Sequence, residues 1–294
     1  MRARALWAIV EDSWRESWAR RASVVLALIS VGLLLLFAFG VGVRDVAGQP
    51  GMVTISLFGM ELGQTRVEIR SGERTITQHG LVVSKSDFVK AVELGALGLL
   101  IPWGILFGLF VATGLFSSML VRGRLYLLLS KPLARWELYL GRYAGGVFLV
   151  FVTTMLFCIG IWGLLWQKTG IADAGLLGAG GLVVFVFAIL YSFAALIALL
   201  TEGTGIALVA TVVLWGLAEV ASLRDTLRAF APTLGSIADF LYYLLPKLND
   251  LEALMNRVIS SGGVLDLAVP VGASALFAAV MLALGIYIFS RRDY

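Results

Sequence analysis

Long segments without charged residues dominate this chain. Six of them reach the length of about 20 apolar residues that a helix needs to cross the hydrocarbon core of a bilayer. They are residues 22–43, 94–121, 143–167, 174–201, 203–223 and 267–290, and the fifth contains Glu219 as its only charged residue. The sequence therefore predicts an all-α, polytopic membrane protein with six transmembrane helices and a single transmembrane domain over residues 1–294.

The composition excludes an ordinary soluble enzyme. Charged residues make up 14% of the chain, whereas a soluble protein carries about 25%, and the mean hydropathy is +0.93. A net charge of +4 would suit nucleic acid if the basic residues formed a stripe on a soluble face. Most lie beside the apolar segments instead, so we interpret them as determinants of topology, and we expect a lipid bilayer and no nucleic acid as partner.

The distribution of Lys and Arg also predicts the orientation. These residues are densest in segments 1–21, 122–142 and 291–294, which places the N-terminus and the C-terminus in the cytoplasm and the chain in the cell inner membrane. The first apolar segment is too long, and too far from the start of the chain, for a cleavable signal peptide.

Residues 1–21 precede the first span and predict a helix in the membrane interface. Trp7, Trp14 and Trp18 recur at helical spacing, opposite charged residues. Tryptophan favours the headgroup region, so we expect this helix to lie along the cytoplasmic leaflet. The alternative is a water-soluble helix that packs on a partner protein.

Two longer inserts are expected on the extracytoplasmic side. In residues 44–93, alternating residues on both sides of a turn at 71–73 predict a β-hairpin, and Ser84-x-x-Asp87 predicts the start of the next helix. Residues 224–266 predict two short amphipathic helices that lie on or dip into the outer leaflet. The first insert is too short for a separate enzyme, so a lid or an external contact surface is the expectation.

The second predicted span contains both a helix breaker and closely spaced small residues. Pro102 predicts a kink. Gly104-x-x-x-Gly108-x-x-x-Ala112 permits close approach of a neighbouring helix.

Residues for most membrane-embedded chemistries are absent from the sequence. There is no His-Glu-x-x-His motif, no histidine or aspartate pair within the spans, and no Gly-x-x-x-x-Gly-Lys-Ser/Thr motif, and the single cysteine is Cys158. We therefore expect no catalytic residues, no metal and no cofactor bound by this chain. Glu219 is the one candidate intramembrane polar site, either as a proton or cation site or as a carboxylate that reaches the interface.

The most specific motif lies between the second and third spans. Residues 128–142 have the sequence Leu-Leu-Ser-Lys-Pro-Leu-Ala-Arg-Trp-Glu-Leu-Tyr-Leu-Gly-Arg, which predicts a turn fixed by proline and a new helix from about Ala134. This segment resembles the Leu-Leu-Ser-Lys-Pro-(Val/Leu)-x-Arg-x-x-(Ile/Leu)-x-x-Gly-(Lys/Arg) signature of ABC-2-type transporter permeases. The overall layout is similar to the group that includes the permease used in nitrous oxide reductase maturation, although the insert at 44–93 is larger than in its shorter members.

The resemblance implies a transport permease that is not itself an enzyme. A cytosolic ATPase dimer would hydrolyse ATP with Mg²⁺, a second permease subunit would complete a homodimer or heterodimer, and an unidentified substrate would be exported. The residues that the resemblance assigns to docking of the ATPase are Lys131, Pro132, Arg135, Trp136 and Glu137, with the helix at 1–21 as a second contact.

Three other interpretations follow from the residues alone. Lys131, Arg135 and Arg142 could simply anchor span ends to lipid headgroups. The chain could be a non-transporting scaffold that docks an extracytoplasmic partner, or an ion-coupled carrier that uses Glu219.

Overall fold

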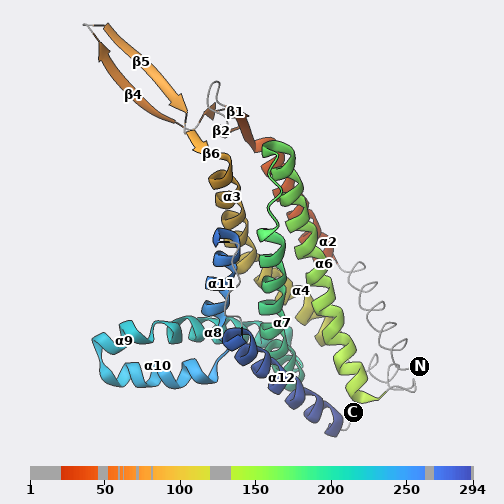
Figure 1. The fold of residues 1–294 in the computed structure, drawn as a ribbon. Helices are drawn as coiled ribbons and strands as arrows, with labels where there is room; N and C mark the ends of the chain where they lie inside the picture. Colours follow the sequence, from red (N-terminus) through yellow and green to blue (C-terminus); the bar gives the residue numbers. More distant parts are fainter. Residues whose placement is uncertain are drawn as a thin grey trace.

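The computed structural model describes residues 21–45, 52–58, 60–61, 63–70, 73–80, 82–119, 134–261 and 268–292. The predicted helix of Trp7, Trp14 and Trp18 lies outside these residues, as do Lys131 and Pro132. The described chain forms a bundle of helices with β-strands at one end (Figure 1). We call this the strand end, and we call the opposite end the Arg135 end, because α6 begins there at Arg135 and α12 ends there at Arg291.

The predicted all-α, polytopic fold is confirmed. Among the described residues, 5 helical segments are long and apolar enough to cross a membrane. They are the continuous helix Lys85–Met119, α6 (Arg135–Thr169), α7 (Gly175–Thr201), α8 (Thr204–Ser222) and α12 (Ala268–Arg291). The first predicted span corresponds to α2 (Arg21–Gly40), in which Ala27–Gly40 forms a shorter apolar helix, so the count of six spans stays a prediction.

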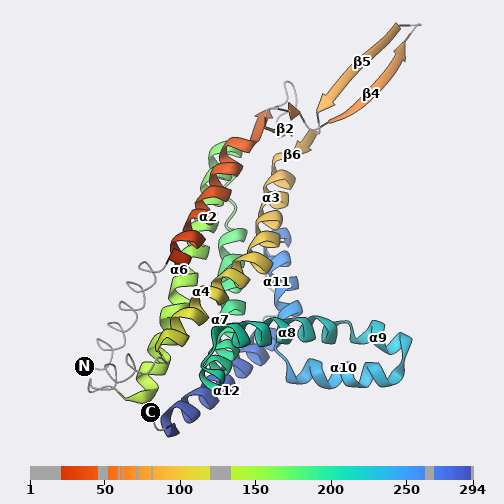
Figure 2. The ribbon, with the colours of Figure 1, turned by 180° about the vertical axis from the view of Figure 1, so that it is seen from behind.

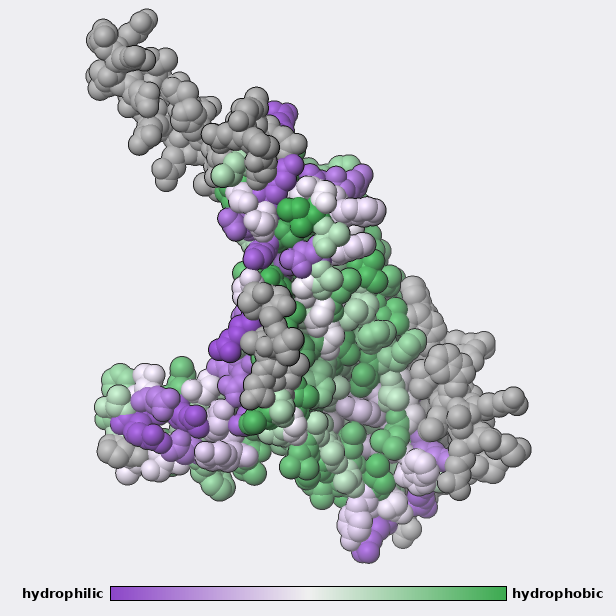
Figure 3. All heavy atoms as spheres, in the orientation of Figure 1, coloured by the Kyte–Doolittle hydropathy of each residue, from purple (hydrophilic) through white to green (hydrophobic). Residues whose placement is uncertain are grey.

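The surface of the bundle fits a bilayer environment. Figure 3 shows hydrophobic side chains over most of the side of the bundle, with hydrophilic ones gathered towards its ends, along the edge where α11 (Leu248–Ser261) lies, and on the projecting α9 and α10. α7 is the most buried of the long helices and packs against α4, α6, α8, α11 and α12. α12 is largely exposed, so its apolar side chains are available to lipid or to another subunit.

Small residues and aromatic rings together set the spacing between the central helices. A Cβ on Gly108 would lie 3.1 Å from Val150, and one on Gly146 would lie 2.7 Å from Tyr191. The Tyr191 hydroxyl donates to the Ala112 carbonyl at 3.1 Å. Glycine at these positions lets α4, α6 and α7 approach closely, as the small residues of the second span predicted for Gly108.

The second span is longer than predicted and changes its helical pitch in the middle. α3 (Lys85–Leu99) begins directly after Ser84, as the Ser84-x-x-Asp87 pattern predicted. The π-helix η1 (Leu100–Gly104) follows, and α4 (Ile105–Met119) completes the span. Pro102 lies in η1, so the predicted kink takes the form of a π-helical turn.

The strand end carries the predicted hairpin and a sheet that was not predicted. β4 (Gly63–Arg70) and β5 (Glu73–Gly80) pair antiparallel with Arg70 opposite Glu73. In the sheet, β2 (Met52–Leu57) pairs with β1 (Val41–Asp45), β3 (Met60–Glu61) and β6 (Val82–Ser84). β1 begins inside the segment predicted as the first span. A short apolar strand and the end of an apolar helix have the same composition, so the sequence does not distinguish them.

The segment between α8 and α12 contains three helices. They are α9 (Arg224–Phe230), α10 (Pro232–Leu244) and α11 (Leu248–Ser261). α9 and α10 form a hairpin that projects sideways from the bundle (Figure 2), whereas α11 packs along α7 with Leu251, Met255 and Ile259 buried. Both predicted amphipathic helices are therefore present, but α11 buries its apolar face against the protein.

Candidate functional site

The start of α6 is fixed by the predicted docking residue Glu137. Its carboxylate accepts a hydrogen bond from the Ala134 N–H at 3.0 Å, and the side chain is buried. This contact satisfies a backbone donor at the helix N-terminus and places a negative charge where the helix dipole favours it. Glu137 thus stabilises the first turn of its own helix.

Arg135, also in the first turn of α6, contacts the end of α12. Its Nη1 donates to the Ser290 carbonyl at 3.1 Å and to the Arg292 carbonyl at 2.8 Å. The last carbonyls of a helix lack partners within the helix and carry partial negative charge. The guanidinium therefore caps the C-terminus of α12.

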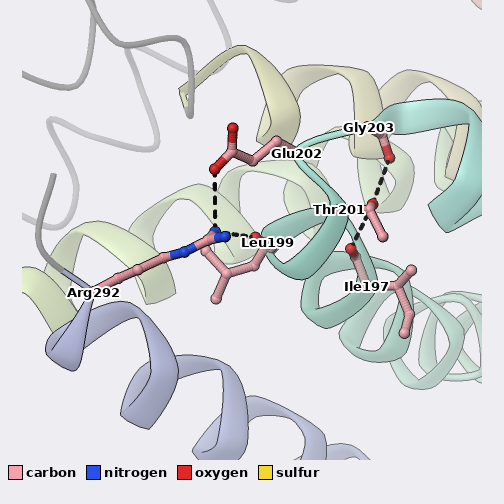
Figure 4. A network of polar contacts seen from close by, with 6 residues as sticks. All are labelled: Ile197, Leu199, Thr201, Glu202, Gly203 and Arg292. Carbon is pink, nitrogen blue, oxygen red and sulfur yellow. Dashed lines mark hydrogen bonds and ion pairs between the residues drawn. The ribbon is translucent and has the colours of Figure 1, made fainter.

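Arg292 in turn contacts the connection between α7 and α8 (Figure 4). Its Nη1 donates to the Leu199 carbonyl at 2.6 Å and lies 3.4 Å from the Glu202 carboxylate. Glu202 has a φ of 52°, the left-handed conformation that often ends a helix. The Thr201 hydroxyl also donates to the Ile197 carbonyl, at 2.8 Å, at the end of α7.

We call Arg135, Arg292 and Glu202 the inner clamp. It joins the first turn of α6, the end of α12 and the α7–α8 connection in one polar network. Trp136 is the neighbour of Arg135, and its side chain is 40% exposed. Of the predicted docking residues that the structure describes, Trp136 is the one whose side chain is both exposed and outside this network.

Basic side chains cap helix C-termini at the strand end as well. Lys168 of α6 donates to the Ala38 carbonyl at 2.8 Å and also to the Val41 carbonyl, where α2 ends. Lys90 of α3 donates to the Ser260 carbonyl at 3.0 Å, where α11 ends. These contacts show that basic residues near span ends hold neighbouring helices together, a role beyond the topology that the sequence indicated.

Glu219, the predicted intramembrane polar residue, lies where α8 meets α11. Glu219 is half-buried. Burial of Glu252 on α11 raises the pKa of Glu252, and the negative charge of Glu219 adds to this increase. Next to it, the Ser222 hydroxyl donates to the Glu219 carbonyl at 2.7 Å and accepts a hydrogen bond from the Asn249 amide. Glu219 is therefore one member of a carboxylate pair between two helices.

Glu93 is a buried acidic residue that the sequence analysis missed. Its side chain is 0% exposed, and its carboxylate interacts with the backbone of Leu176 in the first turn of α7. One carboxylate oxygen of Glu93 and Asp173 Oδ1 lie 3.5 and 3.4 Å from the point where Gly175 would carry a Cβ, at the N-terminus of α7. The dipole of α7 favours a carboxylate there.

A signal for Glu93 was present in the sequence. It stands at helical spacing from Val89 and Leu97, on the face of α3 that is otherwise apolar and buried. The second span was predicted to begin at Leu94, directly after Glu93, so Glu93 fell into the predicted insert.

Among the described residues, no group of three or more His, Cys, Asp or Glu side chains could hold a metal ion. No protein-family model matches the chain, and no curated protein sequence matches it.

Proposed function

We propose that this chain is the membrane-spanning permease subunit of an ATP-binding-cassette transporter, which exports an unidentified substrate while a separate subunit hydrolyses ATP. The observation that carries the proposal is the inner clamp. It links the helix that follows the ABC-2-like motif to α12 through Arg135, and to the α7–α8 connection through Arg292. A displacement of the motif would therefore act on several membrane helices together.

The proposal also requires a surface on which an ATPase can dock. Trp136 offers an exposed aromatic side chain in the first turn of α6, next to the clamp, and buried aromatic residues are frequent anchors of protein interfaces. In this proposal the Arg135 end lies on the cytoplasmic side of the inner membrane. Lys131 and Pro132 would also contact the ATPase. A second permease subunit would pair with this one, and the two would switch access between two packed arrangements when the ATPase closes.

Copurification with a Walker-motif ATPase tests the proposal. We expect the Trp136→Ala variant to lose about tenfold or more of the bound ATPase, since a buried aromatic anchor contributes about 2 kcal/mol or more. Trp166→Ala is the matched control, because Trp166 is 55% exposed at the opposite end of the same helix. Equal ATPase retention by both variants, with unchanged thermal stability, would contradict docking at Trp136.

The carboxylate pair of Glu219 and Glu252 supports a second candidate function, an ion-coupled carrier. Two interacting carboxylates between helices are a common arrangement for binding a proton or a cation. The carrier requires that the purified chain alone accumulates its substrate in vesicles against a gradient, and that Glu219→Gln abolishes this accumulation. Such uphill transport without any second protein would overturn the permease proposal.

A further inference from the structure

A cavity of about 220 Å³ lies between α2, the helix formed by α3, η1 and α4, and α6. Apolar and aromatic side chains make up most of its wall. They include Ile29, Leu33, Trp103, Phe107, Val150 and Phe157. An apolar cavity of about 150 Å³ is large enough to bind benzene and stays dry when empty, so this one has room for a longer hydrocarbon segment.

The cavity lies at the middle of all three helices. Its wall uses residues 29–33 of Arg21–Gly40, residues 99–107 of Lys85–Met119 and residues 150–157 of Arg135–Thr169. For helices that cross a bilayer, this depth is the centre of the hydrocarbon core. The medium beside the cavity is then the acyl chains of the lipids.

The π-helical turn of the second span forms part of this wall. Leu100 and Gly104, the first and last residues of η1, both line the cavity, and Pro102 lies between them. Irregular backbone at membrane depth is tolerated where it is buried in protein or lines a cavity, and π-turns occur frequently at functional sites. The break in the helix and the cavity therefore coincide.

The polar residues of the wall do not select a polar ligand. The Thr153 hydroxyl donates to the Leu149 and Val150 carbonyls of its own helix, each at 3.1 Å. Ser30 has an interaction partner as well. Thr154 is the third hydroxyl-bearing residue of the wall, and the remaining lining residues are apolar or glycine, so the wall offers a ligand mainly hydrocarbon contact.

The wall also reaches the lateral surface of the bundle. Trp103 and Phe107 stack with ring centroids 6.4 Å apart, and their side chains are 58% and 40% exposed. Ile29 of α2, on the other side of the cavity, is 39% exposed. A chain in the surrounding bilayer can therefore reach the cavity from the side, between α2 and α4.

We propose that this cavity binds one acyl chain of a bilayer phospholipid, which enters past Trp103 and Phe107. The inference concerns a lipid site within one subunit and does not depend on the proposed transport function. Free fatty acid offers the same hydrocarbon chemistry, but the phospholipid chains are the ones that surround the cavity at this depth.

Photocrosslinking of the full chain tests the site. The chain is reconstituted in phosphatidylcholine vesicles in which one acyl chain of the lipid carries a diazirine, and mass spectrometry locates the adducts. We expect adducts in the wild-type protein at the α6 residues that line the cavity, which are Val150, Thr153, Thr154 and Phe157. Gly104→Leu should reduce them by about tenfold or more. A Cβ at Gly104 meets only atoms of Leu100, at 3.4 and 3.9 Å, which are ordinary contacts, and the larger side chain adds volume in the wall of the cavity.

Gly98→Leu is the matched control. Gly98 lies on the same continuous helix, is exposed, and has nothing within 4 Å of the position of its Cβ. We expect its adducts to equal those of the wild type. Ile29→Trp, which narrows the entrance from α2, provides a second variant if Gly104→Leu does not fold. Unchanged adducts in the cavity variants, or adducts only with a free diazirine fatty acid, would overturn the proposal.

Discussion

The phenol of Tyr139 lies in the space that a side chain at Gly285 would occupy. A Cβ built on Gly285 would lie 2.1 Å from the Tyr139 hydroxyl oxygen. Tyr139 is fully buried, with its ring edge-to-face against Phe116 at 5.2 Å and tilted against Phe289 at 6.1 Å. Glycine at position 285 therefore allows α12 to pack against α6 close to the inner clamp.

Gly285→Ala should destabilise the protein, because the added methyl group overlaps a buried ring. Overpacking of this kind costs about 1–3 kcal/mol. Thermal unfolding in detergent measures the effect. Gly272→Ala is the control on the same helix, since nothing lies within 4 Å of its Cβ position, and equal melting temperatures for the two variants would contradict the packing described here.

Removing the hydroxyl from two buried tyrosines should have different effects. The Tyr191 hydroxyl donates to the Ala112 carbonyl at 3.1 Å, whereas that of Tyr139 has no hydrogen-bond partner within the described residues. We expect Tyr191→Phe to cost about 1 kcal/mol, and Tyr139→Phe to be neutral or stabilising because it removes an unsatisfied buried polar group. Parallel melting curves of the two variants distinguish these outcomes, and the reverse order would contradict the assignment.

Glycine should be tolerated at position 202. Glu202 has a φ of 52°, which glycine adopts without strain, and left-handed backbone costs other residues about 1 kcal/mol. The ion pair with Arg292 is partly exposed, so its loss costs about 1 kcal/mol or less. We expect Glu202→Gly to melt at or above the wild-type temperature. Glu202→Ala should melt lower than both, because it keeps the strain and loses the ion pair.

The stability of the α8–α11 contact should depend on pH through Glu252. Burial and the charge of Glu219 raise the pKa of Glu252 in the folded protein. The folded state therefore holds this proton more tightly than the unfolded state, and the associated stability is full below the unfolded pKa and is lost as the pH rises through the folded pKa.

Glu252→Gln removes this dependence. We expect the variant to gain stability relative to the wild type at pH 8 and to lose that advantage at pH 4, as measured by melting temperature across the range. Asp225→Asn serves as the control, because the Asp225 side chain is 84% exposed. A constant difference between Glu252→Gln and the wild type at all pH values would rule out the effect.

The sequence predicted the helices better than the contacts between them. Uncharged segments of spanning length located α6, α7, α8 and α12 to within a turn or two, since a bilayer leaves few alternatives to a helix. The start of α3 was predicted from Ser84-x-x-Asp87, but the apolar second span was placed after Glu93. The packed helix begins earlier, since a helix can continue past charged residues such as Lys90 and Glu93 where neighbouring elements pack against it.

The contacts of the inner clamp were less accessible to sequence reasoning. Arg135 was predicted to dock a partner, and the structure shows its guanidinium bound to carbonyls at the end of α12, more than 150 positions along the chain. Lys168 follows the third apolar segment in the sequence, and nothing in that position indicates that its side chain caps α2. Such contacts depend on which helix ends meet in space, and no local pattern of residues records that.

The length of α6 has a mechanical consequence. The helix has 35 residues, about 52 Å, whereas the hydrocarbon core of a bilayer is about 30 Å thick. Its first turn holds α12 through Arg135, and its last turn holds α2 and β1 through Lys168. If α6 moves as a rigid body, a tilt of about 5° displaces one end of the helix by roughly 4–5 Å relative to the other end. A force on the Arg135 end of α6 could therefore displace β1 at the opposite end of the helix.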